Sequence, residues 1–362
     1  MTIAVKLAEE TIAMGRYRSD GLIDFAAAVL AGAGLEAPKT RTVAEILVEG
    51  DLIGHDTHGL QLLPAYVRQL REGTMTASGE HEVVSDRAAV AVWDGRYLPG
   101  AWLTVQALEA ASGRATRYGV GAVAIRRSHH IACLAAYLPR ITSRNQVGMI
   151  ACADPAVATV APFGGLDAVF TPDPIAFGFP TDGDPVVIDM SASITTNGMA
   201  GRLAARGERF REKWLQDSDG TATNDPKVLS QEPPGTILPT GGKDHGHKGY
   251  GLALIVESLS LGLAGFGRVD GPRQWGASVY VQVFDPELFS GAGAFGRQTG
   301  HLAALCRQSR VPDGAQPVRL PGEQALKTKR LRLREGIELD EDRVKSLGDL
   351  AVEYGLAPPT AI

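Results

Sequence analysis

The sequence predicts an α/β protein in which a helical N-terminal unit precedes a larger mixed α/β region. Its 362 residues are enough for a sizeable core and for two structural domains. Hydrophobic residues make up 44% of the chain and charged residues 21%, as is typical of a globular protein. Helical periodicity fills the first part of the chain, and short β-like runs follow. We expect a helical domain at 20–82, joined by a C-terminal helix at 340–357, and an α/β domain at 83–330 with an irregular insertion at about 205–245.

Three helices are expected in the first unit. After Asp20, the segment LIDFAAAVLAGAG carries apolar residues on one face and ends in glycines. A second helix is expected after Pro38, in TRTVAEILVEGDLIG. The segment PAYVRQLREG begins with proline and ends with glycine, which is typical of a short helix.

The second region alternates β-like runs with helices. The runs are punctuated by Gly, Pro and Asp: HEVVSD, AAVAVWDG, GVGAVAIRRS, QVGMIACAD, AVFTPDPIAFGFP and DPVVIDMSAS. A helix, LTVQALEAASGRATRYG, lies among them, and another is expected from about Tyr250 to Leu263. The last forty residues, from KTKRLRLREGIELD onward, predict a strand and then a final helix.

Charge and composition exclude several classes of protein. The net charge of −5, the pI of about 5.9 and the scattered basic residues argue against nucleic-acid binding. The N-terminus lacks the apolar core of a signal peptide, and the long apolar stretch GLALIVESLSLGLAGFG contains Glu257, which favours a buried helix over a membrane span. Three widely spaced cysteines, Cys133, Cys152 and Cys306, predict core thiols in a reducing compartment. We therefore expect a cytoplasmic protein without a membrane partner.

Six of the eight histidines fall into three tight groups: His55 and His58, His129 and His130, His245 and His247. Imidazole is a common zinc ligand, so a metal site is the obvious alternative to acid–base chemistry. No group has the H-E-x-x-H spacing that sets two ligands one helical turn apart, and adjacent histidines point to different sides on most backbones. We expect no metal.

Two glycine-rich segments are candidate nucleotide-binding motifs. GVGAVA, from Gly119, fits G-x-G-x-x-A, but it follows a helix and leads into a strand, the reverse of the Rossmann context. GGKDHGHKGYGL leads into a helix with Lys248 at its start, so it predicts either a close backbone approach to a ligand or only a tight turn. Asp189, at the end of the apolar run PVVIDM, either caps a turn or orients a histidine.

Taken in order, the motifs resemble the malate/L-lactate dehydrogenase family of the second type, which also contains ureidoglycolate and sulfolactate dehydrogenases, diketogulonate reductase and cyclic imino acid reductases. The resemblance extends from about Leu22 to Leu356. It is carried by GDLIGHDTHGL, AIRRSHHIA, PIAFGFP, VVIDMSAS, GHKGYGLALIVESLSLGLAG and RLPGE. It implies an α/β fold with a mixed-sheet, non-Rossmann nicotinamide-binding domain, a helical domain, and a homodimer.

The resemblance also implies the site. The family's proton donor falls on His58, its neighbouring serine becomes Thr57, and its orienting acid falls on Asp189. His55 stands outside the core pattern and is expected to be structural. A histidine suits hydride chemistry because it gives a proton in reduction and takes it back in oxidation. The implied residues for NAD or NADP are His130, Pro174, Ile175, Ala176, Phe177, Gly178, His247, Lys248, Gly249, Gly322 and Glu323.

Departures from the family pattern lie where the substrate is expected. Leu62 replaces the family's carboxylate-binding arginine, and SHHIA, from Ser128, replaces Ser-Asn-His-Phe-Gly. Either another base, such as Arg68, Arg126 or Arg127, binds the carboxylate, or the substrate differs. The implied function is an NAD(P)-dependent oxidoreductase of a small polar 2-oxo or 2-hydroxy acid or a related carbonyl compound. The alternatives are a reductase of cyclic imino acids or of a specialised pathway ketone, and a non-catalytic cofactor-binding relic.

Overall fold

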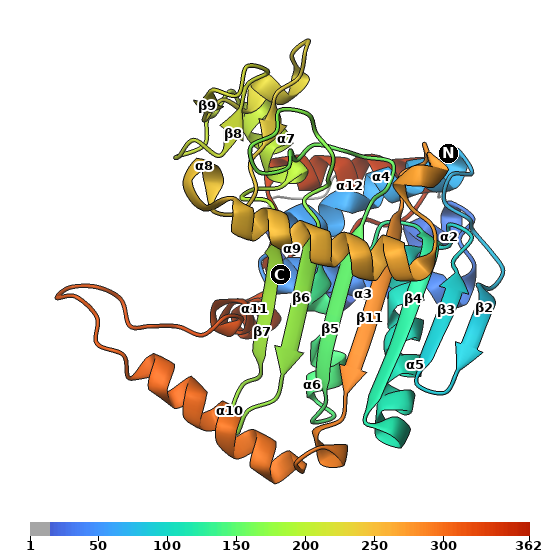
Figure 1. The fold of residues 1–362 in the computed structure, drawn as a ribbon. Coiled ribbons are helices and arrows are strands. Elements are labelled where there is room, and N and C mark those ends of the chain that lie inside the picture. Colours follow the sequence, from blue (N-terminus) through green and yellow to red (C-terminus); the bar gives the residue numbers. More distant parts are fainter. Residues whose placement is uncertain (1–14) are drawn as a thin grey trace.

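The computed structural model describes residues 15–362, so the N-terminal segment considered as a signal peptide lies outside the described residues. The centre of the molecule is a seven-stranded sheet in the order β2-β3-β4-β11-β5-β6-β7 (Figure 1). Only β3 and β4 run parallel, and all other neighbours are antiparallel. The strands are β2 (Glu82–Arg87), β3 (Val90–Asp94), β4 (Val120–Ser128), β5 (Val147–Ala153), β6 (Pro174–Phe179), β7 (Val186–Ser191) and β11 (Ala277–Phe284). This mixed sheet confirms the predicted α/β class.

The central strand β11 was not expected from the sequence. It pairs with β4 on one side and β5 on the other, and most of its side chains are buried. Its segment, ASVYVQVF, is rich in β-branched and aromatic residues, as buried strands are. Its two partners come more than a hundred residues earlier, so their pairing is a product of the tertiary fold.

Helices cover both faces of the sheet. α5 packs against β4 and β11, whereas α9 and the π-helical turn that continues it lie across the opposite face (Figure 1). The helices α2, α3 and α4 form the N-terminal unit, and α12 packs against α2 and α4. Their bounds are α2 (Ser19–Gly32), α3 (Ala37–Leu52), α4 (Leu63–Arg71), α5 (Gly100–Tyr118), α6 (Pro139–Thr142), α9 (His247–Glu257), the π-helical turn (Ser258–Gly262) and α12 (Glu341–Tyr354). None of the helices in residues 15–362 is long and apolar enough to cross a membrane.

One continuous core joins the N-terminal helices to the sheet. It includes Val43 of α3, Leu108 of α5 and Val279 of β11, all inaccessible to solvent. A smaller core lies between the opposite face of the sheet and the π-helical turn. α5 ends at Tyr118, Gly119 follows with φ of 83°, and β4 starts at Val120, which confirms the helix-to-strand order inferred for GVGAVA.

The segment expected to be an irregular insertion has short regular elements and its own small core. β8, β9 and β10 form a three-stranded sheet, and Phe210, Leu215 and Ile237 are buried beside it. The elements here are α7 (Asn197–Arg206), β8 (Leu215–Gln216), β9 (Ala222–Thr223), β10 (Thr236–Ile237) and α8 (Gly242–His245).

Of the segment KTKRLRLREGIELD, in which a strand was expected, only Ile337–Glu338 form a strand, whereas KTKRLRLRE belongs to helix α11 (Glu323–Glu335). Leu331 and Leu333 alternate with charged residues as in a half-buried strand, yet both side chains are exposed. α10 (Ala292–Arg307), which was not predicted, and residues 308–322 form an arm that leaves the body and returns to α11 (Figure 1). After α11, β12 (Ile337–Glu338) pairs with β1 (Arg16–Tyr17).

Candidate active site

The predicted proton donor lies on a short 3₁₀ helix, Asp56–His58, that follows α3. The chain turns out of α3 through Gly54, whose φ of 86° favours glycine. The backbone amide of His55 donates to the carbonyl of Gly50 at 2.8 Å, so the loop folds back over the end of the helix. The loop is therefore fixed to the end of α3 by backbone hydrogen bonding.

A buried ion pair holds this loop from below. Asp51 of α3 is inaccessible to solvent, and its Oδ1 accepts a hydrogen bond from Nη1 of Arg343, in α12, at 3.0 Å. Its Oδ2 accepts from the amide of Leu60 at 2.9 Å. Gly59 is needed here, since a Cβ at that position would lie 2.1 Å from Oδ1 of Asp51. Burial raises the pKa of Asp51 to about 7, against the lowering effects of the Leu60 amide and Arg343.

α11 adds a second cation. Nη1 of Arg332 donates to Oδ1 of Asp56 at 2.9 Å and also to the backbone carbonyl of Asp51. Lys329, one helical turn earlier, binds Glu49 of α3 at 2.6 Å. The helix mistaken for a strand thus holds the loop that carries the proposed catalytic histidine.

His58 is partly buried, and its Nδ1 lies 3.0 Å from the hydroxyl of Thr57. That contact leaves Nε2 as the ring atom for a substrate. Burial lowers the pKa of His58, the charge of Asp189 opposes this effect, and His55 adds to it. The imidazole is therefore biased towards its neutral form near neutral pH.

Asp189 lies in the middle of the edge strand β7, opposite Ala176 of β6. Its Oδ2 accepts from the amide of Ala135 at 2.8 Å and from the thiol of Cys133 at 3.6 Å. Among the hydrogen bonds of residues 15–362, none joins Asp189 to His58. Asp189 thus acts on His58 through its charge rather than through a direct hydrogen bond.

The second histidine pair faces the first. The ring of His130 stacks on His58 with centroids 5.9 Å apart, and its Nδ1 is hydrogen-bonded to the hydroxyl of Tyr66 at 2.9 Å. Trp275 packs against His130 at 4.8 Å and against His129 at 5.0 Å. His129 is fully buried without a hydrogen-bond partner for either ring nitrogen, and burial lowers its pKa to about 3. Both rings are thus held neutral in an aromatic wall.

The segments implied for the cofactor converge on β7. β6, which contains residues 174–178, pairs with it directly. Gly322, before α11, lies so close that a Cβ would be 3.0 Å from the backbone of Val187. A Cβ at Gly249 would lie 2.5 Å from the carbonyl oxygen of Ala192, the residue after β7. These two glycines are therefore needed for packing. Residues 174–178 form a strand, as predicted from the sequence.

Two features fit a phosphate-bearing cofactor beside β7. Lys248 and His247 are exposed at the first turn of α9, where backbone amides and the helix dipole favour an anion. No hydrogen bond or salt bridge engages Lys248 within residues 15–362. Glu323, in contrast, is bound to Arg307 and accepts from the amide of Leu320, so it serves to fix the start of α11.

The residues expected to bind the substrate are already engaged in contacts within the protein. Ser128 is buried, and its hydroxyl donates to the carbonyl of His129 at 2.8 Å. Leu62 packs against the main core. Arg126 and Arg127 both bind the buried carboxylate of Asp94, so neither is free to hold a substrate carboxylate.

Sequence reasoning missed two residues that contact the predicted site residues. Tyr66 and Trp275 hold the second histidine pair, and neither lies in a recognised motif. His55, expected to be structural, has one ring nitrogen within 4.8 Å of the Sγ of Cys133 and a carboxylate oxygen of Asp189.

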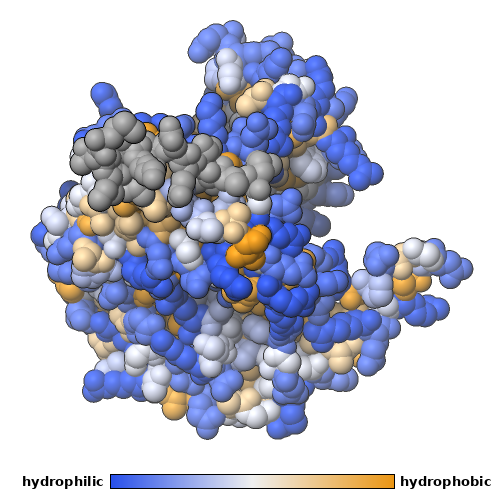
Figure 2. All heavy atoms as spheres, turned by 180° about the vertical axis from the view of Figure 1, so that it is seen from behind, coloured by the Kyte–Doolittle hydropathy of each residue, from blue (hydrophilic) through white to orange (hydrophobic). Residues whose placement is uncertain are grey.

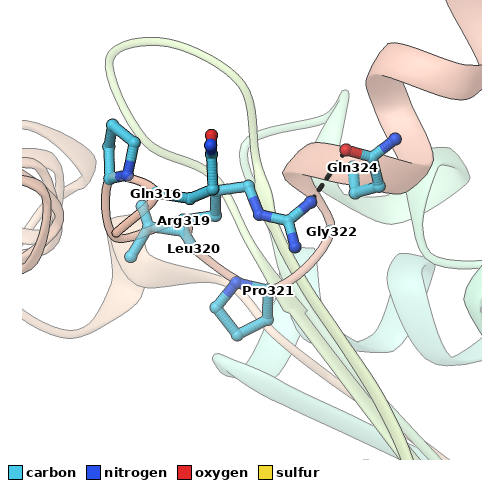
Figure 3. Close-up of a pocket in the computed structure, with 7 residues that line it drawn as sticks. Gln316, Arg319, Leu320, Pro321, Gly322 and Gln324 are labelled. Carbon is cyan, nitrogen blue, oxygen red and sulfur yellow. Dashed lines mark hydrogen bonds between the residues drawn. The ribbon is translucent and has the colours of Figure 1, made fainter. Parts of the chain in front are cut away.

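A surface hollow of about 540 Å³ lies at the base of the arm (Figure 3). Arg319 donates to the side chain of Gln324 at 2.8 Å across it. Of the residues implied for the site, only Gly322 lines this hollow. The hollow is therefore a neighbour of the cofactor segments and not the place of the acid–base chemistry.

The mixed sheet places a partly buried histidine near a carboxylate, an arrangement that suits acid–base chemistry on an α/β scaffold. The family model "Malate/L-lactate dehydrogenase" matches residues 17–348, so the chain belongs to the malate/L-lactate dehydrogenase family. This confirms the resemblance and identifies the chain as a member of a family of dehydrogenases, which implies a nicotinamide cofactor.

Relatives match along almost their whole length. Hydroxycarboxylate dehydrogenase B of Escherichia coli K12 is 29% identical, covering 95% of this chain and 96% of that protein. L-sulfolactate dehydrogenase of Methanocaldococcus jannaschii is 30% identical, covering 91% and 94%. The solved malate dehydrogenase of Pyrococcus horikoshii has a TM-score of 0.85 at 25% identity, covering 95% and 96%. The Δ1-piperideine-2-carboxylate reductase of Pseudomonas syringae shares the fold, with a TM-score of 0.81 at 24% identity, covering 93% and 99%.

Proposed function

We propose that this protein is an NAD(P)-dependent oxidoreductase that transfers hydride to or from the carbonyl carbon of a small polar 2-oxo or 2-hydroxy acid or a related compound. The names of the relatives, which include dehydrogenases of hydroxycarboxylates, sulfolactate and malate, support this class. The observation that carries the proposal is His58, partly buried on a clamped loop with Nδ1 bonded to Thr57 and the charge of Asp189 nearby.

In this proposal His58 is the acid and base. Thr57 holds Nδ1, so that Nε2 gives a proton to the substrate oxygen in reduction and removes it in oxidation. Asp189 stabilises the imidazolium through its charge, which opposes the effect of burial. The neutral rings of His129 and His130 form the opposite wall and exclude water from the reacting atoms.

A bound nicotinamide would supply or accept the hydride. We propose that β6, the start of α9 and the start of α11 hold this cofactor along β7. Lys248 binds a phosphate there, and His130 lies against the nicotinamide end. The convergence of these separate segments on one strand supports the assignment. The activity assay described below compares NADH with NADPH as the cofactor.

The substrate is proposed to be less anionic at one end than a simple dicarboxylate. Leu62 packs on the core, and both arginines of β4 bind Asp94. This favours, as a second candidate, a cyclic imino acid or a ketone of a specialised pathway, in which His58 protonates nitrogen or oxygen.

We also propose that the protein is a homodimer and acts in the cytoplasm. The arm, formed by α10 and residues 308–322, stands clear of the body in Figures 1 and 2. It exposes Leu302 and Leu305, each more than half accessible. Apolar side chains on a projecting helix are typical of an interface, and a second copy of this chain is the partner proposed.

Oxidation of NADH and NADPH, followed with 2-oxo acids, cyclic imino acids and neutral ketones, tests the function. His58→Ala is expected to lower kcat/KM about 10²- to 10⁴-fold without changing the melting temperature. Thr57→Ser, which keeps the hydroxyl, is the matched control and should retain activity. Cofactor binding without turnover of any compound would favour the non-catalytic relic. Absence of both would refute the proposal.

A further inference from the structure

Three potential metal ligands lie close together near His58. Two of them have no role in the proposed hydride chemistry. A ring nitrogen of His55, the Sγ of Cys133 and a carboxylate oxygen of Asp189 all lie within 4.8 Å of one another. They come from three distant segments: the loop after α3, the segment after β4, and β7. Only Asp189 is used in the proposed proton transfer.

The donor types and spacing suit zinc. Zn²⁺ prefers thiolate, imidazole and carboxylate ligands, whereas Mg²⁺ and Ca²⁺ prefer oxygen alone. Zn–S bonds of about 2.3 Å and Zn–O bonds of about 2.0–2.2 Å at a tetrahedral angle separate the two ligand atoms by roughly 3.5–3.7 Å. The Sγ of Cys133 lies 3.6 Å from Oδ2 of Asp189. Two ligands thus already have the required separation, and a ring nitrogen of His55 lies within 4.8 Å of both.

The surroundings hold two ligands rigidly and leave the third adjustable. Cys133 is only 2% exposed within the main core, and the amide of Ala135 fixes the carboxylate of Asp189 at 2.8 Å. His55 is exposed, which leaves its side chain free to adjust to an ion. Three protein ligands leave one tetrahedral position open to water.

We propose that His55, Cys133 and Asp189 form a zinc site that inhibits the enzyme. Binding replaces the thiol proton of Cys133, which is released to solvent, by a Zn–S bond. The bound ion ties the carboxylate of Asp189 to itself and places positive charge beside His58, so the imidazolium loses its support. The inhibition rests on the proposed dehydrogenase function, whereas the metal site itself does not.

Co²⁺ binding tests the site without any activity measurement. Metal-free full-length protein titrated with Co²⁺ should develop a thiolate-to-cobalt charge-transfer band with one ion per chain. Cys133→Ser should abolish the band, and Cys306→Ser, the matched control at a partly exposed thiol of α10, should keep it. Because Cys133 is buried, its variant risks misfolding. His55→Gln, at an exposed position, is the second variant and should weaken Co²⁺ binding at least about 10-fold.

Zinc inhibition tests the consequence. Zn²⁺ should inhibit the wild-type enzyme reversibly, with activity restored by a chelator. With inhibition expressed relative to each variant's own activity without zinc, His55→Gln should need at least about 10-fold more Zn²⁺ for half inhibition. No charge-transfer band in the wild type, or a band lost in Cys306→Ser, overturns the site. Inhibition equal in wild type and His55→Gln overturns its regulatory role. A Cys133-dependent band in a chain without dehydrogenase activity upholds the site and refutes the proposed function instead.

Discussion

The two histidine pairs that face each other across the candidate site are held by opposite means. The loop with His58 is fixed by charge, through Asp51 and Arg343 below it and Arg332 beside it. The rings of His129 and His130 are held by aromatic packing and burial, and the hydroxyl of Tyr66 is hydrogen-bonded to Nδ1 of His130.

This difference determines what each pair can do. A charged clamp positions a loop without covering it, so His58 keeps a free nitrogen and the nearby charge of Asp189. Burial in an aromatic wall removes the charged form instead, and His129 is therefore neutral at any pH near 7. The first arrangement suits proton transfer, and the second suits a dry and shaped surface.

The largest effect is expected from breaking the charged clamp. Arg343→Met leaves Asp51 buried without its cation and should lower the free energy of unfolding by about 3 kcal/mol, measured by urea denaturation. The double variant with Asp51→Asn should be more stable than Arg343→Met alone, since no unpaired charge remains. Arg144→Met, at an exposed pair with Glu109, is the control and should cost under about 1 kcal/mol. Equal losses in the two single variants would contradict the clamp.

The second effect is a dependence of stability on pH that comes from the buried ring of His129. The pKa of His129 is about 3 in the folded chain and 6.5 ordinarily. Between these values only the unfolded chain binds this proton, so stability is lost as pH falls below 6.5, by about 1.4 kcal/mol per pH unit. His129→Asn should lose this part of the acid sensitivity in urea denaturation at pH 7 and pH 5. His245→Asn, at an exposed histidine, should keep it, and an unchanged slope in His129→Asn would show that the ring is not buried neutral.

A smaller loss of stability is expected from removing the hydrogen bond between Tyr66 and His130. Tyr66→Phe removes the hydroxyl bonded to Nδ1 of His130 and should cost about 1 kcal/mol of stability. Because His130 is proposed to contact the cofactor, the dissociation constant for NADH should rise as well, measured by fluorescence titration. Stability and cofactor affinity both equal to wild type would mean that the hydroxyl does not position His130.

The smallest expected change is a shift of a pH profile. Burial lowers the pKa of His58 below 6.5, so kcat/KM for oxidation, which needs the neutral base, should fall only below that pH. Asp189 opposes this lowering by its charge, and Asp189→Asn should therefore move the acid limb to still lower pH. A limb that moves to higher pH, or stays in place, would contradict the electrostatic role of Asp189.

The order of helices and strands could largely be predicted from the sequence, because each depends on local periodicity. The exceptions have physical causes. β11 becomes recognisable only once β4 and β5 enclose it, and α11 has alternating leucines without a buried face. Division into a helical domain at 20–82 and an α/β domain at 83–330 stays a prediction, since a single core connects the two.

The sequence by itself determined the family and the fold class, because these depend on short motifs and their order along the chain. It also pointed to His58, Thr57 and Asp189 as the catalytic candidates. The tertiary structure decided how they are held. Asp51 meets Arg343 across 292 residues, and His55 meets Cys133 and Asp189 from separate segments. Burial and charge pairing depend on such distant partners, which no local pattern of residues contains.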